Sequence, residues 1–245
     1  PGRLIAPKQI ESWRSFVAGA ARPLRAKYGL KAPQPTSKTE WDLRRMVVGA
    51  LGAVGDEHVL TWANGQVDAF QNRLDYDREM AGVAMGIFGS HGGEATFTQL
   101  AEALHREPDA NRRGILMRGI LAHRHPGAVI QTMNLFQDER LRANERGRVL
   151  WGSAYSVEKR DEAWAWVRAN FEFIKAKLGE RRISRMPYYA VSHCNAQAKQ
   201  QTVDAFSSAK IEGMARHLSN AIDSIDQCIE QKRRYGTGIE KMMRK

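Results

Sequence analysis

Apolar side chains recur at intervals of three and four residues through almost the whole chain, and this spacing constrains the fold more than any other feature. Such spacing places the residues on one face of a helix. Strict alternation of apolar and polar residues, which is typical of strands, is almost absent. The clearest sets are Ile10, Trp13, Val17, Ala20 and Leu24; Trp164, Val167, Phe171, Ile174 and Leu178; and Ile211, Met214, Leu218, Ile222, Ile225 and Ile229. The pattern predicts an all-α chain.

Capping residues and helix breakers divide this pattern into about eleven or twelve helices. Ser37 followed by Glu40 reads as a capping box, in which each side chain satisfies a free backbone N–H. Asp56 and Asn195 stand at further helix starts. Ser156 is expected to cap one long helix that runs to Gly179. The last helix is expected to end before Tyr235-Gly236, and the glycine-rich stretch from Gly86 to Gly93 is interpreted as a tight turn between helices.

Short links between consecutive helices favour antiparallel packing of neighbours. From residue 37 the pairs recur every ~30–40 residues, a period typical of HEAT and armadillo arrays. The prediction is a HEAT/armadillo-like α-α superhelix, a curved array of antiparallel helix pairs. Residues 1–235 would form a single helical-repeat domain, and residues 236–245 a flexible basic tail.

A net charge of +11 is typical of proteins that bind nucleic acids, but the distribution of the charge along the chain argues against that function. Residues 1–31 carry seven Lys and Arg and one Glu, and residues 232–245 carry six and one. The 200 residues between them carry 25 basic and 25 acidic side chains. Nucleic-acid binding is therefore the least favoured function. Because no apolar run reaches about 18 residues, no membrane partner is expected, and the chain is expected to be soluble, in the cytoplasm or exported.

The sequence lacks the motifs of the common catalytic and metal sites. A zinc peptidase needs an HExxH helix, in which two histidines lie one turn apart, but no two of the seven histidines are four residues apart. His123 and His125 are interpreted as a capping or surface feature. Of the two cysteines, Cys228 falls on an apolar stripe and is expected to be a free buried thiol. No catalytic residue, metal or cofactor is assigned to this chain.

Two sets of side chains leave a binding role open. Arg181, Arg182 and Arg185 follow Gly179 at a helix junction and could hold a carboxylate, although a solvated face that caps the preceding helix is favoured. Asp138 is favoured as a helix cap. Most of the six tryptophans fall near apolar stripes, so core packing is favoured over ligand stacking for this group, which includes Trp151. Trp166 lies off the stripe of its helix and is the candidate for stacking.

The order of several short motifs between Leu135 and Phe206 resembles a known family. These motifs are Gln137-Asp138, Ala163-Trp164, Asn170-Phe171, Ser184-Arg185, Cys194 and Asp204-Ala205-Phe206, followed by a long last helix. The order is similar to that in the C-terminal helical domain of aminopeptidase N-like, puromycin-sensitive and endoplasmic-reticulum aminopeptidases. A weaker match extends upstream to Ser37.

The resemblance implies a non-catalytic domain that closes over a zinc-containing catalytic domain of the same polypeptide. It implies that this domain helps to enclose a chamber, holds the far end of peptide substrates and shapes their access. Gln137, Asp138 and Arg185 match positions that would face such a chamber. The zinc and the exopeptidase residues would belong to the catalytic domain, and the parent protein would be a zinc aminopeptidase.

Two other functions remain open at this point. The chain could be a free-standing helical-repeat scaffold that binds a protein partner. A helical-repeat nucleic-acid binder could use the two basic ends of the chain, and its affinity would then fall steeply with salt.

Overall fold

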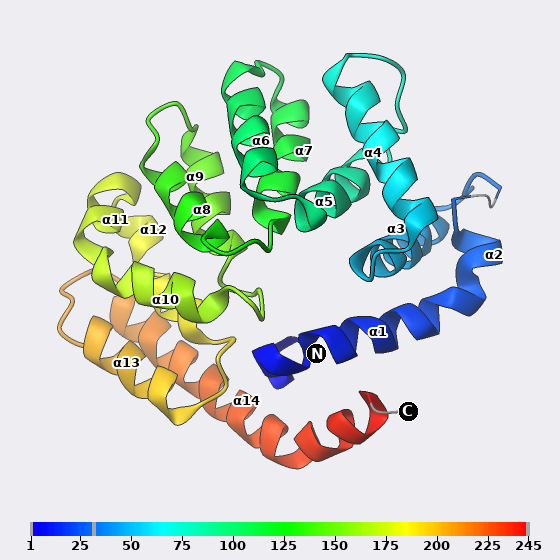
Figure 1. Cartoon of the computed structure of the whole chain (residues 1–245). Coiled ribbons are helices and arrows are strands. Elements are labelled where there is room, and N and C mark those ends of the chain that lie inside the picture. Colours follow the sequence, from blue (N-terminus) through cyan, green and yellow to red (C-terminus); the bar gives the residue numbers. More distant parts are fainter. Residues whose placement is uncertain (1, 31–32, 244–245) are drawn as a thin grey trace. The chain divides into compact units, whose positions relative to one another are not determined.

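The structure is a computed structural model that describes residues 2–30 and 33–243. Every regular element in these ranges is helical, which confirms the predicted all-α fold (Figure 1). The elements form two compact units, Glu11–Ala128 and Pro1–Ile10 together with Val129–Lys245. Across the described ranges, each helix is too short or too polar to span a lipid bilayer.

The unit Glu11–Ala128 is built from packed helix pairs. Its elements are α1 (Ile10–Ala21), the 3-10 turn η3 (Arg22–Leu24), α2 (Arg25–Tyr28), α3 (Lys38–Ala53), α4 (Glu57–Gln71), α5 (Ala81–His91), α6 (Glu94–Arg106) and α7 (Ala110–Ala122). Helix α5 packs on both α4 and α7, and α6 packs on α7. The buried residues Val48, Leu51, Val59 and Ala63 belong to a core that joins α3, α4 and α5.

Local side-chain chemistry sets the ends of these helices as predicted. The Ser37 hydroxyl accepts a hydrogen bond of 3.2 Å from Glu40 N, and the Glu40 carboxylate accepts one from Ser37 N. Asp56 caps α4 and Asp109 caps α7, each through its carboxylate and a backbone N–H three residues on. Gly55, which ends α3, has a φ of +79°, a conformation that glycine adopts without steric cost.

The glycine-rich stretch 86–93 differs from its predicted role as a turn. Helix α5 continues to His91, and only Gly92 and Gly93 lie in the link to α6. A Cβ on Gly89 would lie 2.1 Å from the carbonyl oxygen of Gly119, so the missing side chain lets α5 and α7 approach closely. His123, expected as a capping or surface feature, is the C-cap residue of α7, but it is fully buried, and its ring lies 5.4 Å from that of Phe97.

The second unit contains the C-terminal half of the chain. Its elements are the 3-10 turns η1 (Gly2–Leu4) and η2 (Pro7–Gln9), α8 (Ala128–Gln137), α9 (Ala143–Gly152), α10 (Arg160–Ala169), α11 (Phe171–Leu178), α12 (Glu180–Ile183), the 3-10 helix η4 (Met186–Ala190), α13 (Ala196–Phe206) and α14 (Met214–Met243). Helices α13 and α14 lie side by side (Figure 1). Helix α14 also packs on η4. Buried Trp164 lies against Tyr189 and Phe206, with ring centroids 6.1 and 6.0 Å away.

Two helix boundaries in this unit were predicted wrongly. The long helix expected from Ser156 to Gly179 is two helices, α10 and α11, and α10 begins after Lys159. The break falls at Asn170, whose side-chain amide donates 2.8 Å to the carbonyl oxygen of Trp166 and so satisfies a backbone group at the end of α10. Helix α14 runs to Met243, past the expected end at Tyr235-Gly236. Ion pairs from Arg233 and Arg234 to Glu230 support this part of the helix.

Candidate functional site

A cavity of about 740 Å³ lies within the C-terminal unit, among α9, the ends of α11 and α12, and η4. Three aromatic side chains line it, those of Trp151, Tyr155 and Tyr188. Two positive side chains, Arg182 and Arg185, share the same lining. We call this cavity the aromatic–arginine pocket. Among the described residues that line it, none is acidic.

Trp151 is anchored from behind by the core. Its ring lies 5.4 Å from the ring of Tyr189, which is completely buried. The Tyr189 hydroxyl donates a hydrogen bond of 2.9 Å to the carbonyl oxygen of Leu150, and burial raises the pKa of Tyr189, so the ring stays neutral. Tyr155 follows α9 in a turn and is 52% exposed. Together, Trp151 and Tyr155 present aromatic surface that the fold itself leaves uncovered.

Tyr188 connects the pocket wall to helix α14. Its hydroxyl accepts a hydrogen bond of 3.3 Å from the Asn220 side chain and lies 3.4 Å from Nδ1 of His217. Desolvation lowers the pKa of His217, and the positive charges of Arg216 and Arg185 lower it further. His217 is therefore mainly neutral at pH 7. Because His217 and Asn220 of α14 contact Tyr188, the position of this wall of the pocket depends on where α14 lies.

The two arginines of the pocket differ in what holds them. Arg182 donates a hydrogen bond of 3.2 Å to the carbonyl oxygen of Ala143, at the start of α9. In the part of the chain that the structure describes, the exposed Arg185 guanidinium has no hydrogen-bond or ion-pair partner. Arginine offers N–H donors in a planar fork that fits both oxygens of a carboxylate. Arg185 is thus free to bind an anion at the pocket.

This arrangement suits a ligand that carries a negative group next to an apolar one. The anion would pair with Arg185, and the apolar part would lie on Trp151 and Tyr155, because aromatic side chains bury a large area with few rotatable bonds. Three of its lining residues, Trp151, Arg182 and Tyr188, are held by contacts outside the pocket, as in the largely pre-formed sites that bind small molecules.

The structure places the three predicted chamber residues in different surroundings. Arg185 lines the aromatic–arginine pocket, and neither Gln137 nor Asp138 is part of its lining. Gln137 is the exposed last residue of α8. The Asp138 carboxylate accepts hydrogen bonds from the backbone N of Arg140, at 2.9 Å, and from its guanidinium, at 2.7 Å. Asp138 therefore forms a local turn, while the N-cap of α9 is Arg142.

Sequence reasoning missed the aromatic half of the pocket. Trp151 was assigned to core packing, and Tyr155 and Tyr188 were not singled out. Of the basic cluster, Arg182 and Arg185 line the pocket, and the side chain of Arg181 lies outside the described residues. A usable signal was present, because Tyr155 is a large aromatic residue in a turn between Ala154 and Ser156, with no place on a helical stripe.

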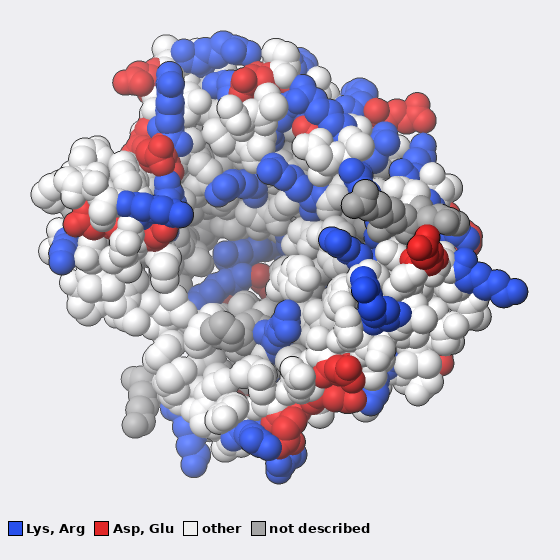
Figure 2. Space-filling view, turned by 180° about the vertical axis from the view of Figure 1, so that it is seen from behind, with Lys and Arg blue, Asp and Glu red and all other residues white. Residues whose placement is uncertain are grey.

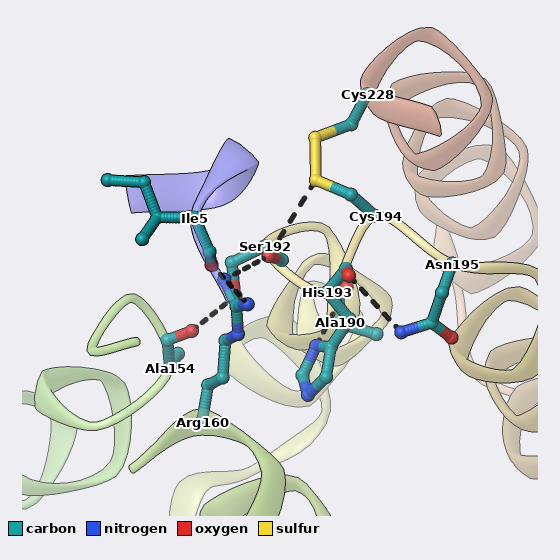
Figure 3. Close-up of a disulfide and its surroundings, with 9 residues drawn as sticks. All are labelled: Ile5, Ala154, Arg160, Ala190, Ser192, His193, Cys194, Asn195 and Cys228. Carbon is teal, nitrogen blue, oxygen red and sulfur yellow. Dashed lines mark hydrogen bonds between the residues drawn. A yellow bond between two sulfur atoms is a disulfide. The ribbon is translucent and has the colours of Figure 1, made fainter. Parts of the chain in front are cut away.

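A disulfide joins Cys194 to Cys228, and their Cα atoms are 5.1 Å apart (Figure 3). The prediction that Cys228 is a free thiol is therefore wrong, although the prediction that it is buried is confirmed. Cys194 lies in the link between η4 and α13, and Cys228 lies in α14. Periodicity showed which face of α14 is buried but not which residue that face would meet.

Arg160 holds the segment next to the disulfide. It is 4% exposed, and its guanidinium donates 2.6 Å to the carbonyl oxygen of Ser192 and 3.2 Å to that of Ile5 (Figure 3). The Ser192 hydroxyl donates 2.5 Å to the carbonyl oxygen of Ala154. Burial lowers the pKa of Arg160, and the charge of Asp161 partly opposes this effect. The link 191–195 is thus tied to Arg160, to Ala154 and, through the disulfide, to α14.

Basic side chains are not confined to one part of the surface. Lys and Arg side chains appear at many separate places on the face shown in Figure 2, with Asp and Glu side chains among them. Among the described residues, no group of three or more His, Cys, Asp and Glu side chains lies close enough together to hold a metal ion.

Comparisons of the chain with known proteins indicate its family. The family model described as the ERAP1-like C-terminal domain matches residues 2–227. A curated relative, named probable aminopeptidase 2 of Sulfurisphaera tokodaii, is 20% identical over 171 residues. That match covers 67% of this chain and 21% of the relative, so the chain spans about a fifth of the length of the protein it matches.

Proposed function

The chain belongs to the family of ERAP1-like C-terminal domains, and we propose that it is the non-catalytic C-terminal domain of a zinc-dependent aminopeptidase. In this proposal the domain covers the catalytic domain of the same polypeptide and shapes the access of peptides to its chamber. The zinc ion and the residues that cleave the peptide bond belong to the catalytic domain.

We further propose that the aromatic–arginine pocket binds the end of the peptide that is remote from the cleaved bond. An aminopeptidase acts at the amino terminus, so the remote end carries the α-carboxylate. The observation that carries this proposal is the free Arg185 guanidinium beside the exposed ring of Tyr155 and the anchored ring of Trp151. A carboxylate with an apolar last side chain satisfies both features of the pocket.

Binding to the isolated chain tests this directly. Calorimetric titration would compare an N-acetylated peptide that ends in phenylalanine with the same peptide as its C-terminal amide. The free acid is expected to bind about tenfold or more tightly, since a charge-assisted hydrogen bond contributes about 1.5–3 kcal/mol. Equal affinities would show that the pocket does not recognise the carboxylate.

The proposed parent enzyme has a separate test. The coding sequence upstream of Pro1 is expected to encode an HExxH motif, whose two histidines and glutamate bind zinc and activate water. A parent reading frame without that motif would contradict the aminopeptidase assignment. It would leave the peptide-binding measurement to be judged on its own.

A further inference from the structure

We propose that the Cys194–Cys228 disulfide makes the affinity of the aromatic–arginine pocket dependent on thiol redox state, by fixing α14 against the wall that carries Tyr188. This inference rests on the proposed peptide-binding role of the pocket. It adds a regulatory connection between a covalent bond and that site.

The first step of the argument is the double attachment of α14 to the η4 region. Near its start, His217 and Asn220 contact the Tyr188 hydroxyl at 3.4 and 3.3 Å. Further along, Cys228 is bonded to Cys194, which lies four residues after the end of η4. The non-covalent contacts to Tyr188 are long hydrogen bonds, so the disulfide is the firmer of the two attachments.

The second step is that the link 191–195, which carries Cys194, is held in place by contacts other than the disulfide. Arg160 holds the carbonyl oxygen of Ser192 at 2.6 Å, and the Ser192 hydroxyl holds that of Ala154 at 2.5 Å (Figure 3). The Asn195 side chain caps α13 with a bond of 2.8 Å to Ala198 N. Because the link 191–195 is fixed in this way, loss of the disulfide would loosen α14 from the link, and the Lys199–Asp226 ion pair of 2.7 Å and the packing on α13 would be left to hold that part of the helix.

The chemical step is ordinary thiol–disulfide exchange with a dithiol. One thiolate of the dithiol attacks a sulfur of the pair, and the Sγ–Sγ bond breaks to release one cysteine as a thiolate. The second thiolate of the dithiol then attacks the mixed disulfide and releases the other cysteine. Two electrons and two protons pass to Cys194 and Cys228, which become thiols, and the dithiol closes to its cyclic disulfide. Both cysteines are nearly buried, at 3% and 2% exposure, so a dithiol reaches the bond only when α14 moves away.

Linkage makes the effect reciprocal. If the disulfide raises the affinity of the pocket, a ligand that holds Tyr188 in place must also keep α14 against Tyr188 and slow the reduction of the disulfide. This reciprocity separates a coupled bond from a bond that only stabilises the fold. A purely structural disulfide would leave the affinity of the folded, reduced chain unchanged.

The test uses the full chain in oxidised form, in dithiothreitol-reduced form and as the variant C194S/C228S. Calorimetry with the N-acetylated peptide that ends in phenylalanine is expected to show that loss of the disulfide lowers the affinity by a factor of about five or more relative to the oxidised chain. Saturating peptide is expected to slow reduction by a similar factor. Equal affinities in the folded oxidised and reduced chains, with a reduction rate that peptide leaves unchanged, would overturn the proposal.

Hydrogen exchange supplies a readout that does not need the peptide. Reduction is expected to speed amide exchange in η4 and in the first half of α14, while α9 stays protected. Uniform exchange changes would contradict the inference, and a peptide that binds neither form would contradict only the proposed function.

H217A/N220A keeps the disulfide but removes the contacts to Tyr188, and it is expected to weaken binding as well. Q227A, an exposed neighbour of Cys228, is the matched control and should change nothing.

Discussion

Arg160 donates a hydrogen bond of 2.6 Å to the carbonyl oxygen of Ser192 from a guanidinium that is almost completely buried. A second bond of 3.2 Å reaches the carbonyl oxygen of Ile5, so one side chain joins the start of α10 to two chain segments that are distant in sequence. Buried backbone carbonyls rarely lack a donor, because an unsatisfied one costs about 1–3 kcal/mol.

Replacing Arg160 with methionine tests the contribution of these bonds. Methionine keeps most of the side-chain volume but leaves both carbonyl oxygens without their donor, so we expect the free energy of unfolding to fall by about 3 kcal/mol. Urea unfolding monitored by circular dichroism measures the change. Arg148→Met, at an exposed position in α9, is the matched control. An Arg160 variant as stable as the control would show that these bonds contribute little.

The disulfide should also contribute directly to stability. It closes a loop with a sequence separation of 34, and the chain-entropy model gives about 3 to 4 kcal/mol for a loop of that size. C194A/C228A is therefore expected to unfold at a clearly lower urea concentration than the oxidised chain. Adding dithiothreitol should destabilise the wild-type chain and leave this variant unaffected. An effect of dithiothreitol on both proteins would mean that it acts elsewhere.

Two glycines in α5 give a paired prediction about helix packing. A Cβ at Gly89 would lie 2.1 Å from the Gly119 carbonyl oxygen, so Gly89→Ala must push α5 and α7 apart and should cost about 2–3 kcal/mol. A Cβ at Gly86 meets nothing within 4 Å, so Gly86→Ala should stabilise the chain by about 0.5–1 kcal/mol. Thermal unfolding of the two variants should shift in opposite directions. Shifts of the same sign would argue against the close contact of α5 and α7.

His193 predicts a loss of stability in mild acid. Desolvation lowers its pKa below the usual 6.5, and this effect outweighs the nearby Asp161 carboxylate at 3.3 Å, which raises it. Below about pH 6.5 His193 becomes protonated in the unfolded chain, while it stays neutral in the native chain until the pH reaches its lower native pKa. The free energy of unfolding should therefore fall as the pH decreases from 6.5 to the native pKa, and then become level with respect to this group.

Urea titrations at several pH values between about 7.5 and 5 measure this dependence. His193→Gln is expected to reduce the slope, because glutamine does not titrate. His217 also has a lowered pKa, so some slope should remain in the variant. An unchanged slope in His193→Gln would assign the whole effect to other groups.

The elements that sequence reasoning predicted correctly are those set by neighbours in the chain. The caps at Ser37, Asp56 and Asn195 each depend on a side chain and a backbone N–H three residues away, and all three are present. The stop at Gly179 is likewise local, and its φ of +74° suits glycine. The buried stripes follow from helical period alone.

What the sequence could not show depends on contacts between distant residues. Cys194 and Cys228 pair only because α14 packs beside η4, and nothing in their spacing indicates it. In the candidate site, Arg185 was singled out from sequence, whereas Trp151, Tyr155 and Tyr188 meet only when α9 and η4 are folded together.

The most direct test of the central claim is the affinity of Arg185→Gln for the two peptides that end in phenylalanine, as free acid and as amide. The account predicts that this variant loses the preference for the free acid, about tenfold in the wild-type chain, while its affinity for the amide stays the same. Arg148→Gln, an exposed arginine of α9 outside the pocket, should keep the wild-type preference. An Arg185→Gln variant that still prefers the free acid as strongly as the wild type would contradict the claim that this pocket recognises the peptide carboxylate.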